Sequence, residues 1–357
     1  MLKTSYINKQ INIPYLLKIG PGKFDKIGKY LADKEMSNIV LFWGEGLSSS
    51  LGKRLYTGLK KNKVKIAFEE NVSRIDIETV TQTAFELPSN VDAIISIGGG
   101  KALDFGKYCG YLLKIPYISV PTSPSNDGFC SPTSSLTVGG KRKSIKSSIP
   151  FGVVIDLDII KTCPPSHLFS GIGDMISKTT ALWDWKKAAD KGLARYNDFA
   201  SIIAYDSLDI LFLRHSLDIL SAKFQRSLVT SLLMSGISAE MAGTSRPASG
   251  SEHLISHALD EISITPRQHG IQVGVSTYLC ALLQGNPNTD DIRDVLEHTG
   301  FFDFVRKDPL DKEEYLEALA LAPSIKNNYY TILSEGNSLS KAKKLINKDK
   351  VLKTLIV

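Results

Sequence analysis

Short apolar runs alternate with longer amphipathic segments over residues 39–157 of this chain. Apolar residues recur at helical spacing in three of these longer segments, 51–61, 77–87 and 102–113. Strands that alternate with helices of about this length are typical of a parallel sheet with helices on both faces. The pattern therefore predicts an α/β domain. Its buried strands are expected at 39–44, 65–70, 93–100, 117–122 and 153–157.

The pattern changes after Pro164 and Pro165. Strand signals almost vanish there, and apolar residues recur at helical spacing. We therefore predict that an all-α domain follows the α/β domain. The expected helices are 171–188, 198–214, 222–242, 251–261, 270–284, 291–297 and 312–321.

The length of 357 residues suits two domains at roughly 150 residues each. We place the α/β domain at 1–160 and the helical domain at 161–357, with a ligand cleft at their junction. Hydrophobic residues make up 43% and charged residues 22% of the chain. This composition is usual for a globular protein and excludes a disordered tail, a collagen-like repeat and a disulfide miniprotein.

The segment 134–148, between the last two predicted strands, is expected to form a β-hairpin. Gly139 and Gly140 suit its two-residue turn, because both positions need a positive φ. Lysine and arginine gather on the second arm of this hairpin, either as a solvated face or as a binding site for an anionic ligand. These residues are Lys141, Arg142, Lys143 and Lys146.

Charge and cysteine usage narrow the range of partners. Lys and Arg (43) outnumber Asp and Glu (37), a net charge of +6 that requires no nucleic-acid partner. Neither a signal-peptide-like apolar run near residue 1 nor 18 consecutive apolar residues occur, so we expect no membrane span. Four dispersed thiols without a Cys-x-x-Cys pair predict a cytoplasmic protein with free cysteines, Cys109, Cys130, Cys163 and Cys280.

Gly98, Gly99 and Gly100 end one predicted strand and open a helix. Glycines let the backbone approach a pyrophosphate, and a helix N-terminus offers unpaired N–H groups to it. A simple turn is the alternative, since the motif is not G-x-G-x-x-G. The next predicted strand runs into a loop rich in hydroxyl and amide groups, PTSPSNDG at 121–128, where open α/β sheets bind ligands.

Histidines cluster in the helical half. His253 and His257 are four residues apart on a predicted helix, and His269 opens the next helix. Asp174 is the best carboxylate to complete a metal site with them. An aspartate and two histidines with an open position are typical of catalytic zinc, because structural zinc is closed by four protein ligands. Core-facing histidines and a helix-stabilising aspartate remain the alternative on these residues alone.

Five segments, GGGKALD, PTSPSNDGFCSP, GIGDMISKTTALWDW, TSRPASGSEHLISHALD and HGIQVGV, occur in this order. Together they resemble the glycerol-1-phosphate dehydrogenases of archaea and some bacteria. That family belongs to the superfamily of glycerol dehydrogenase, iron-containing alcohol dehydrogenases and dehydroquinate synthase. APSIKNNYYTIL also fits, so the resemblance covers nearly the whole chain. It implies a dehydroquinate synthase-like fold with a Rossmann-like parallel sheet.

The resemblance implies one divalent metal ion, most simply Zn²⁺ and otherwise Ni²⁺ or Fe²⁺. Its ligands would be Asp174, His253 and His269. His257 would then contact the substrate or relay a proton, and Asp127 would bind the substrate. At two positions the loop departs from many relatives, with Asn126 in place of histidine and Pro124 in place of a small residue.

The resemblance also implies NAD or NADP as the coenzyme. Gly44 after the first predicted strand tolerates NADP, whereas the neighbouring Glu45 favours NAD, so the sequence does not decide between them. Matching positions for the pyrophosphate-binding turn and the nicotinamide contacts are Gly98, Gly99, Gly100, Lys101, Asp104, Thr122 and Ser125.

The function implied is reversible, metal-dependent reduction of dihydroxyacetone phosphate to sn-glycerol 1-phosphate with NAD(P)H. Lys146 and Arg246 are the expected phosphate ligands, since both lie beside family motifs. The alternatives are a dehydrogenase of another polyol, alcohol or phosphorylated ketose, a dehydroquinate synthase-like lyase, and a nucleotide-binding regulatory module. We expect a homo-oligomer, as relatives often are.

Overall fold

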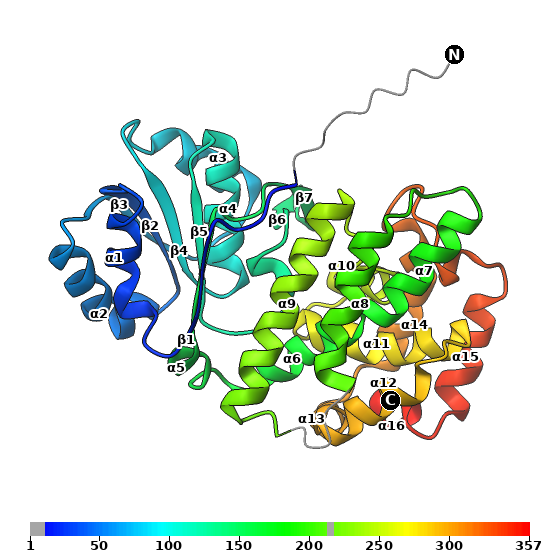
Figure 1. Cartoon of the computed structure of the whole chain (residues 1–357). Helices are drawn as coiled ribbons and strands as arrows, with labels where there is room; N and C mark the ends of the chain where they lie inside the picture. Colours follow the sequence, from blue (N-terminus) through cyan, green and yellow to red (C-terminus); the bar gives the residue numbers. More distant parts are fainter. Residues whose placement is uncertain (1–10, 213–217) are drawn as a thin grey trace, which may run out of the picture.

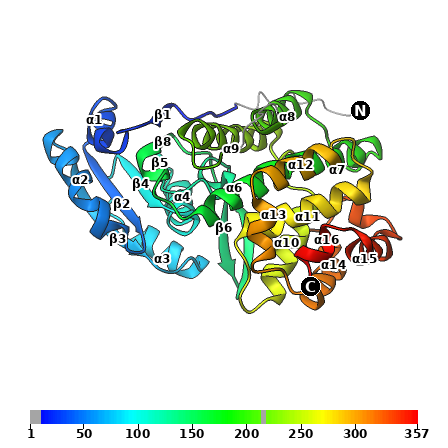
Figure 2. The same cartoon turned by 90° about the horizontal axis from the view of Figure 1, so that it is seen from below.

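The computed structural model describes residues 11–212 and 218–357. A sheet domain occupies one side of the molecule and a helical domain the other, with a short hairpin between them (Figures 1 and 2). All neighbouring strands of the six-stranded sheet run parallel. Their order is β1 (Leu16–Gly20), β8 (Gly152–Asp156), β5 (Tyr117–Pro121), β4 (Ala93–Gly98), β2 (Asn38–Gly44) and β3 (Lys65–Val72).

The five predicted strands are confirmed, with one correction of length and one strand missed. The strand predicted at 93–100 ends at Gly98, because a helix begins at Gly100. The missed strand is β1, which lies at the sheet edge against β8. Only Leu16 and Gly20 of its five residues are buried and Leu17 is exposed, so the strand has no continuous apolar run to detect.

Alternate residues of the strands face opposite layers of helices, as expected for a doubly covered sheet. In β2, Ile39 and Leu41 pack in one cluster, while Val40 and Phe42 pack in the other. The first cluster includes α1 (Ile27–Ala32), α2 (Leu47–Lys61) and α5 (Leu157–Ile160); the second includes α3 (Ile77–Glu86) and α4 (Gly100–Leu113).

The predicted hairpin is confirmed as β6 (Thr133–Val138) and β7 (Lys141–Lys146). Gly139 and Gly140 have φ values of +57° and +77°, as a two-residue turn of type I′ requires. Lys141 forms an ion pair of 2.7 Å with Glu261 of the helical half. The hairpin therefore reaches across from the sheet domain to the helices.

The helical half confirms the predicted change of fold class, with corrections in detail. The segment predicted as one helix at 171–188 is two helices that meet at Ser177. The last two residues of the helix predicted at 198–214 lie outside the described residues. The helices are α6 (Pro165–Ile176), α7 (Lys178–Asp190), α8 (Asp198–Phe212), α9 (Ala222–Ala242), α10 (Ser251–Ile262), α11 (His269–Gln284), α12 (Thr289–His298), α13 (Phe301–Arg306), α14 (Lys312–Leu321), α15 (Ser338–Lys348) and α16 (Leu352–Leu355), of which α13, α15 and α16 were not predicted.

The junction between the halves is packed rather than open throughout. Val153 and Ile155 of β8 belong to the same apolar cluster as Ile172 of α6 and Leu228 of α9. A domain boundary near residue 160 remains our proposal. The four cysteines are free, and none of the helices in the described part of the chain is long and apolar enough to cross a membrane.

Candidate active site

A cavity of about 670 Å³ lies between the two domains. Its wall combines the start of α4, the loop after β5, the hairpin and the helices α9 and α10. The lining includes one glycine of the predicted turn and nine polar or charged residues: Gly100, Asp104, Asn126, Asp127, Arg142, Lys146, His253, His257, His269 and Lys326. One cavity thus joins the glycine turn to the histidine cluster.

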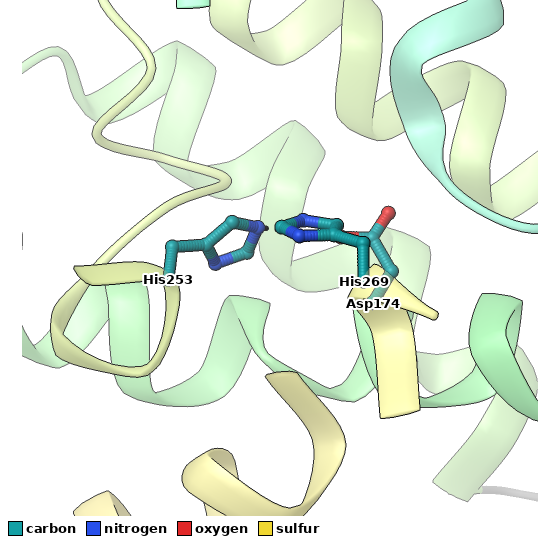
Figure 3. A group of neighbouring side chains, drawn as sticks. All are labelled: Asp174, His253 and His269. Atoms are coloured by element: carbon teal, nitrogen blue, oxygen red, sulfur yellow. Dashed lines mark ion pairs between the residues drawn. The ribbon is translucent and has the colours of Figure 1, made fainter. Parts of the chain in front are cut away.

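Three side chains from three helices converge at the helical end of the cavity. Asp174 of α6, His253 of α10 and His269 of α11 place their ligand atoms within 4.8 Å of one another (Figure 3). His253 Nε2 lies 3.4 Å from Asp174 Oδ1, and the two imidazole centroids are 5.1 Å apart. The structure therefore brings together the three residues that the resemblance implied as ligands.

The orientation of the two imidazoles fits a metal site. His253 Nδ1 lies 2.9 Å from Glu252 Oε1, and His269 Nδ1 lies 3.0 Å from Ser256 Oγ. Each ring therefore uses Nδ1 in an outer hydrogen bond and keeps Nε2 for a ligand bond, as metal-binding histidines usually do. One carboxylate and two imidazoles suit Zn²⁺ or a similar divalent ion, with room for a further ligand from the cavity.

Glu252 and Ser256 were not predicted from the sequence. Glu252 is fully buried and also accepts hydrogen bonds from Thr180 Oγ1 (2.8 Å) and the Gly250 amide (2.6 Å). Burial acts to raise the pKa of this carboxyl, but the His253 contact and the hydrogen bond from Thr180 lower it overall. In the sequence, Glu252 is marked only by its position next to His253, and this position does not show in which direction the Glu252 side chain points.

His257 lies beside the three converging side chains rather than among them. Its ring stacks on that of His269 at a centroid distance of 5.8 Å and lines the cavity. Burial lowers the pKa of His257 well below its usual value, and Lys326 lowers it further. A neutral imidazole at this place can both donate and accept a hydrogen bond.

A fully buried lysine links Asp174 to the loop after β5. Lys178 Nζ lies 3.2 Å from Asp174 Oδ1 and 3.2 Å from Asp127 Oδ2. The Asp127 amide in turn donates to Asp174 Oδ2 at 2.8 Å, and Ser235 Oγ donates to Asp127 Oδ2 at 2.7 Å. Burial acts to raise the pKa of Asp174, but Lys178 and His253 hold it well below its usual value. Lys178 was missed, although its spacing of four from Asp174 would place both on one face of the single helix predicted at 171–188.

The three glycines of the turn at 98–100 differ in why a side chain would be excluded. Gly98 has φ +153°, and a Cβ there would lie 3.1 Å from the Gly44 backbone, so the fold itself requires glycine. A Cβ on Gly99 or Gly100 would meet no atom within 4 Å. The space above the N-terminus of α4 is therefore open, and it fits a pyrophosphate held by backbone amides.

The other residues predicted to bind the coenzyme differ in burial and in whether they line the cavity. Asp104 lines the cavity and pairs with buried Lys107 at 3.2 Å, whose Nζ donates to the Gly128 carbonyl at 2.6 Å. Lys101 is exposed on the first turn of α4. Thr122 and Ser125 are half-buried in the loop after β5, and Glu45 is exposed after β2.

The two predicted phosphate ligands also differ. Lys146 is exposed and lines the cavity. The structure does not bring the Arg246 guanidinium to the cavity as expected: it lies 3.9 Å above the Tyr329 ring, and its Nη1 donates to the Tyr330 carbonyl at 2.9 Å. Stacking on an aromatic face explains this position. A direct contact of Arg246 with phosphate stays a prediction.

Replacing Gly99 by valine is expected to weaken coenzyme binding without unfolding the protein. The added side chain meets no protein atom within 4 Å at its Cβ, so the packing tolerates it. It would occupy the space in which a pyrophosphate approaches the backbone. Titration with NADH and NADPH, followed by fluorescence, measures the loss, and a thermal melt checks the fold. Unchanged affinity for both coenzymes would make the glycines an ordinary turn.

Comparison with known proteins finds relatives that match nearly the whole chain. The family described as iron-containing alcohol dehydrogenase matches residues 18–164. The chain is 31% identical over 350 residues to a protein of Methanosarcina acetivorans named glycerol-1-phosphate dehydrogenase (NAD(P)+), covering 96% of this chain and 97% of that one. A protein of the same name from Metallosphaera sedula is 33% identical over 335 residues, covering 91% and 93%.

Solved structures confirm the predicted fold class. The crystal structure of glycerol dehydrogenase from Schizosaccharomyces pombe superposes with a TM-score of 0.76 at 20% identity, covering 94% of this chain and 89% of that chain. An iron-containing alcohol dehydrogenase of Thermotoga maritima superposes with a TM-score of 0.71. The predicted resemblance is also confirmed, because the sequence matches extend over nearly the whole chain. This chain is an oxidoreductase that belongs to the glycerol-1-phosphate dehydrogenase family.

Proposed function

We propose that the protein reduces dihydroxyacetone phosphate to sn-glycerol 1-phosphate with NAD(P)H, in a reversible reaction that needs a divalent metal ion. The ketone gains a hydride and a proton, and NAD(P)H becomes NAD(P)+. The observation that carries this proposal is the single cavity that joins the open glycine turn to the group of Asp174, His253 and His269. The relatives named for this activity support it.

The residues would divide the work as follows. When bound, the nicotinamide supplies the hydride and the metal polarises the substrate carbonyl. Asp174, His253 and His269 hold the ion, and Glu252 keeps His253 in the tautomer with Nε2 free. Zn²⁺ is the simplest ion for this donor set, and Ni²⁺ or Fe²⁺ are alternatives.

Asp127 and His257 would handle the substrate. Asp127 faces the cavity with its Oδ2 held by Lys178 and Ser235, which orients the carboxylate to accept a hydrogen bond from a substrate hydroxyl. His257 would relay the proton to the developing alkoxide, because its ring borders both the cavity and His269. Lys146 lies on the cavity wall where a phosphate dianion can reach it.

The coenzyme would lie over the N-terminus of α4. The open space at Gly99 and Gly100 receives the pyrophosphate, and Gly98 fixes the turn. Lys101, Asp104, Thr122 and Ser125 keep their predicted places around the coenzyme as part of this proposal. NAD and NADP stay equal candidates. A cytoplasmic homo-oligomer is likewise a proposal.

A dehydrogenase of an uncharged polyol is the second candidate, favoured by the fold match to glycerol dehydrogenase. A lyase that uses NAD only transiently would show no net turnover of NADH.

A matrix of coenzymes and ketones on zinc-loaded protein tests the proposal. Dihydroxyacetone phosphate should exceed dihydroxyacetone by at least about a hundredfold in kcat/KM, because each charged contact to a phosphate is worth about 1.5–3 kcal/mol. Oxidation of NADH or NADPH is followed at 340 nm. Equal rates with both ketones would overturn the glycerol-phosphate assignment and leave the polyol dehydrogenase.

A further inference from the structure

We propose that Lys326 binds the phosphate group of the substrate and so determines the preference for a phosphorylated ketone. This inference rests on the proposed function and adds the residue that would recognise the phosphate group of its substrate. Lys326 follows the short helix at Ala322–Ser324 and lines the cavity that also contains His257. It lies in the segment APSIKNNYYTIL, whose residues have no predicted role beyond the family resemblance.

Lys326 is held in place by a hydroxyl group and an aromatic ring rather than by a counter-ion. Its Nζ lies 3.5 Å from Ser249 Oγ and 4.8 Å from the centroid of the Tyr329 ring. Among the residues that the structure describes, no carboxylate oxygen lies within 4.0 Å of this Nζ. Removing the Lys326 ammonium group from water without a paired anion costs free energy. An anionic ligand in the cavity would supply that missing partner.

The segment that carries Lys326 is held by two contacts of Tyr329. The Tyr329 hydroxyl donates to the Ser249 carbonyl at 2.5 Å, and the Arg246 guanidinium stacks on the Tyr329 ring at 3.9 Å from its centroid. This bracing holds the segment after Ala322–Ser324 against the loop before α10. Arg246 therefore positions the segment, while Lys326 faces the cavity.

The other two cations of the cavity wall are less suited to a dominant role. Arg142 and Lys146 are both exposed on the hairpin, where water and salt screen their charge. Arg142 Nε also donates to Ser135 Oγ at 2.7 Å, and its charge stabilises the neighbouring Asp260 carboxylate. Lys326 is half-buried, and burial lowers its pKa to about 8. A bound dianion would favour the charged amine again.

A kinetic comparison tests the role of Lys326. In Lys326→Met, kcat/KM for dihydroxyacetone phosphate should fall by about 10- to 100-fold, mainly through KM, because one charged hydrogen bond is lost. The value for dihydroxyacetone should not change. Lys326→Arg keeps the charge and should recover most of the loss. Lys307→Met, at an exposed lysine far along the helical domain, is the matched control and should behave as wild type.

The coenzyme offers a second source of phosphate, and the same assay separates the two. A loss of activity seen only with NADPH, and not with NADH, would assign Lys326 to the coenzyme and overturn the inference. A loss that is equal with both coenzymes supports the substrate phosphate. Unchanged discrimination between the two ketones in Lys326→Met would also overturn the inference, while the proposed function would stand on the wild-type preference.

Binding of inorganic phosphate tests Lys326 independently of the reaction. Phosphate should raise the melting temperature of wild type and of Lys307→Met, relative to potassium chloride at equal ionic strength, and should fail to do so in Lys326→Met. Without phosphate, Lys326→Met should melt no lower than wild type, because no ion pair is broken. Equal stabilisation of all three proteins by phosphate would overturn the inference. If wild type reduced both ketones equally, the proposed function would fail, and this measurement would still decide on Lys326.

Discussion

His269→Ala is expected to lose the bound metal ion and about three orders of magnitude in kcat, since charge stabilisation by the ion is worth several kcal/mol. Asp174 and His253 alone cannot close a site for a divalent ion. Of the three proposed ligands, His269 can be removed with the least disturbance of the surrounding structure. Its outer partner Ser256 keeps a second hydrogen bond with the side-chain amide of Gln272 at 2.6 Å, so the Ser256 hydroxyl is not left unpaired.

Metal content by elemental analysis and the rate of NAD(P)H oxidation are the two measurements. His253→Ala should lose both as well, but it also leaves fully buried Glu252 without its imidazole partner, so it should melt lower than His269→Ala. His298→Ala, at an exposed histidine of α12, is the control and should keep metal and rate. A fully metallated and fully active His269→Ala protein would remove this residue from the site.

The sheet and the approximate site could be predicted because their signals are continuous in the sequence. Each interior strand is a run of buried residues, such as the one from Ile39 to Trp43, that the alternation of helices then orders into a parallel sheet. The hairpin turn at Gly139 and Gly140 is likewise local, since two consecutive positive φ values favour glycine at both positions. Strand β1 has neither a buried run nor a turn motif, because it forms through its pairing with the distant strand β8.

The parts of the site that could not be predicted depend on contacts between distant segments. Residues alone left open whether His257 or His269 completes the pair with His253, because helical spacing favours His257. The packing of α11 on α10 brings His269 to within 5.1 Å of His253, between ring centroids. Lys326 and Lys178 are ordinary lysines in the sequence, and only the folded chain surrounds the second with two carboxylates.

Lys178→Met is expected to destabilise the metal-free protein by about 3–5 kcal/mol, because breaking a buried ion pair leaves an uncompensated charge. Lys178 is fully buried, and its Nζ stands between Asp127 and Asp174 at 3.2 Å from each. Methionine keeps a similar volume, so the loss reports on charge rather than on a cavity. Urea unfolding of metal-free wild type and variant measures the difference.

A matched control lies on the same helix. Lys186 and Asp190 form an ion pair of 2.9 Å at the same spacing of four residues as Asp174 and Lys178, but both are exposed. Lys186→Met should therefore cost far less, since water screens surface pairs. Similar small losses in the two variants would show that Lys178 contributes no more than a surface lysine.

Zinc should separate the electrostatic role of Lys178 from a purely structural one. Lys178 pairs with Asp174, and an ion bound there would compete with it for the same carboxylate. Removing the lysine lessens the repulsion that an incoming cation meets, and the gain in unfolding free energy on adding Zn²⁺ should be larger in Lys178→Met than in wild type. An equal or smaller gain in the variant would mean that the lysine holds Asp174 in a geometry that the ion needs, and that its charge matters less than its position.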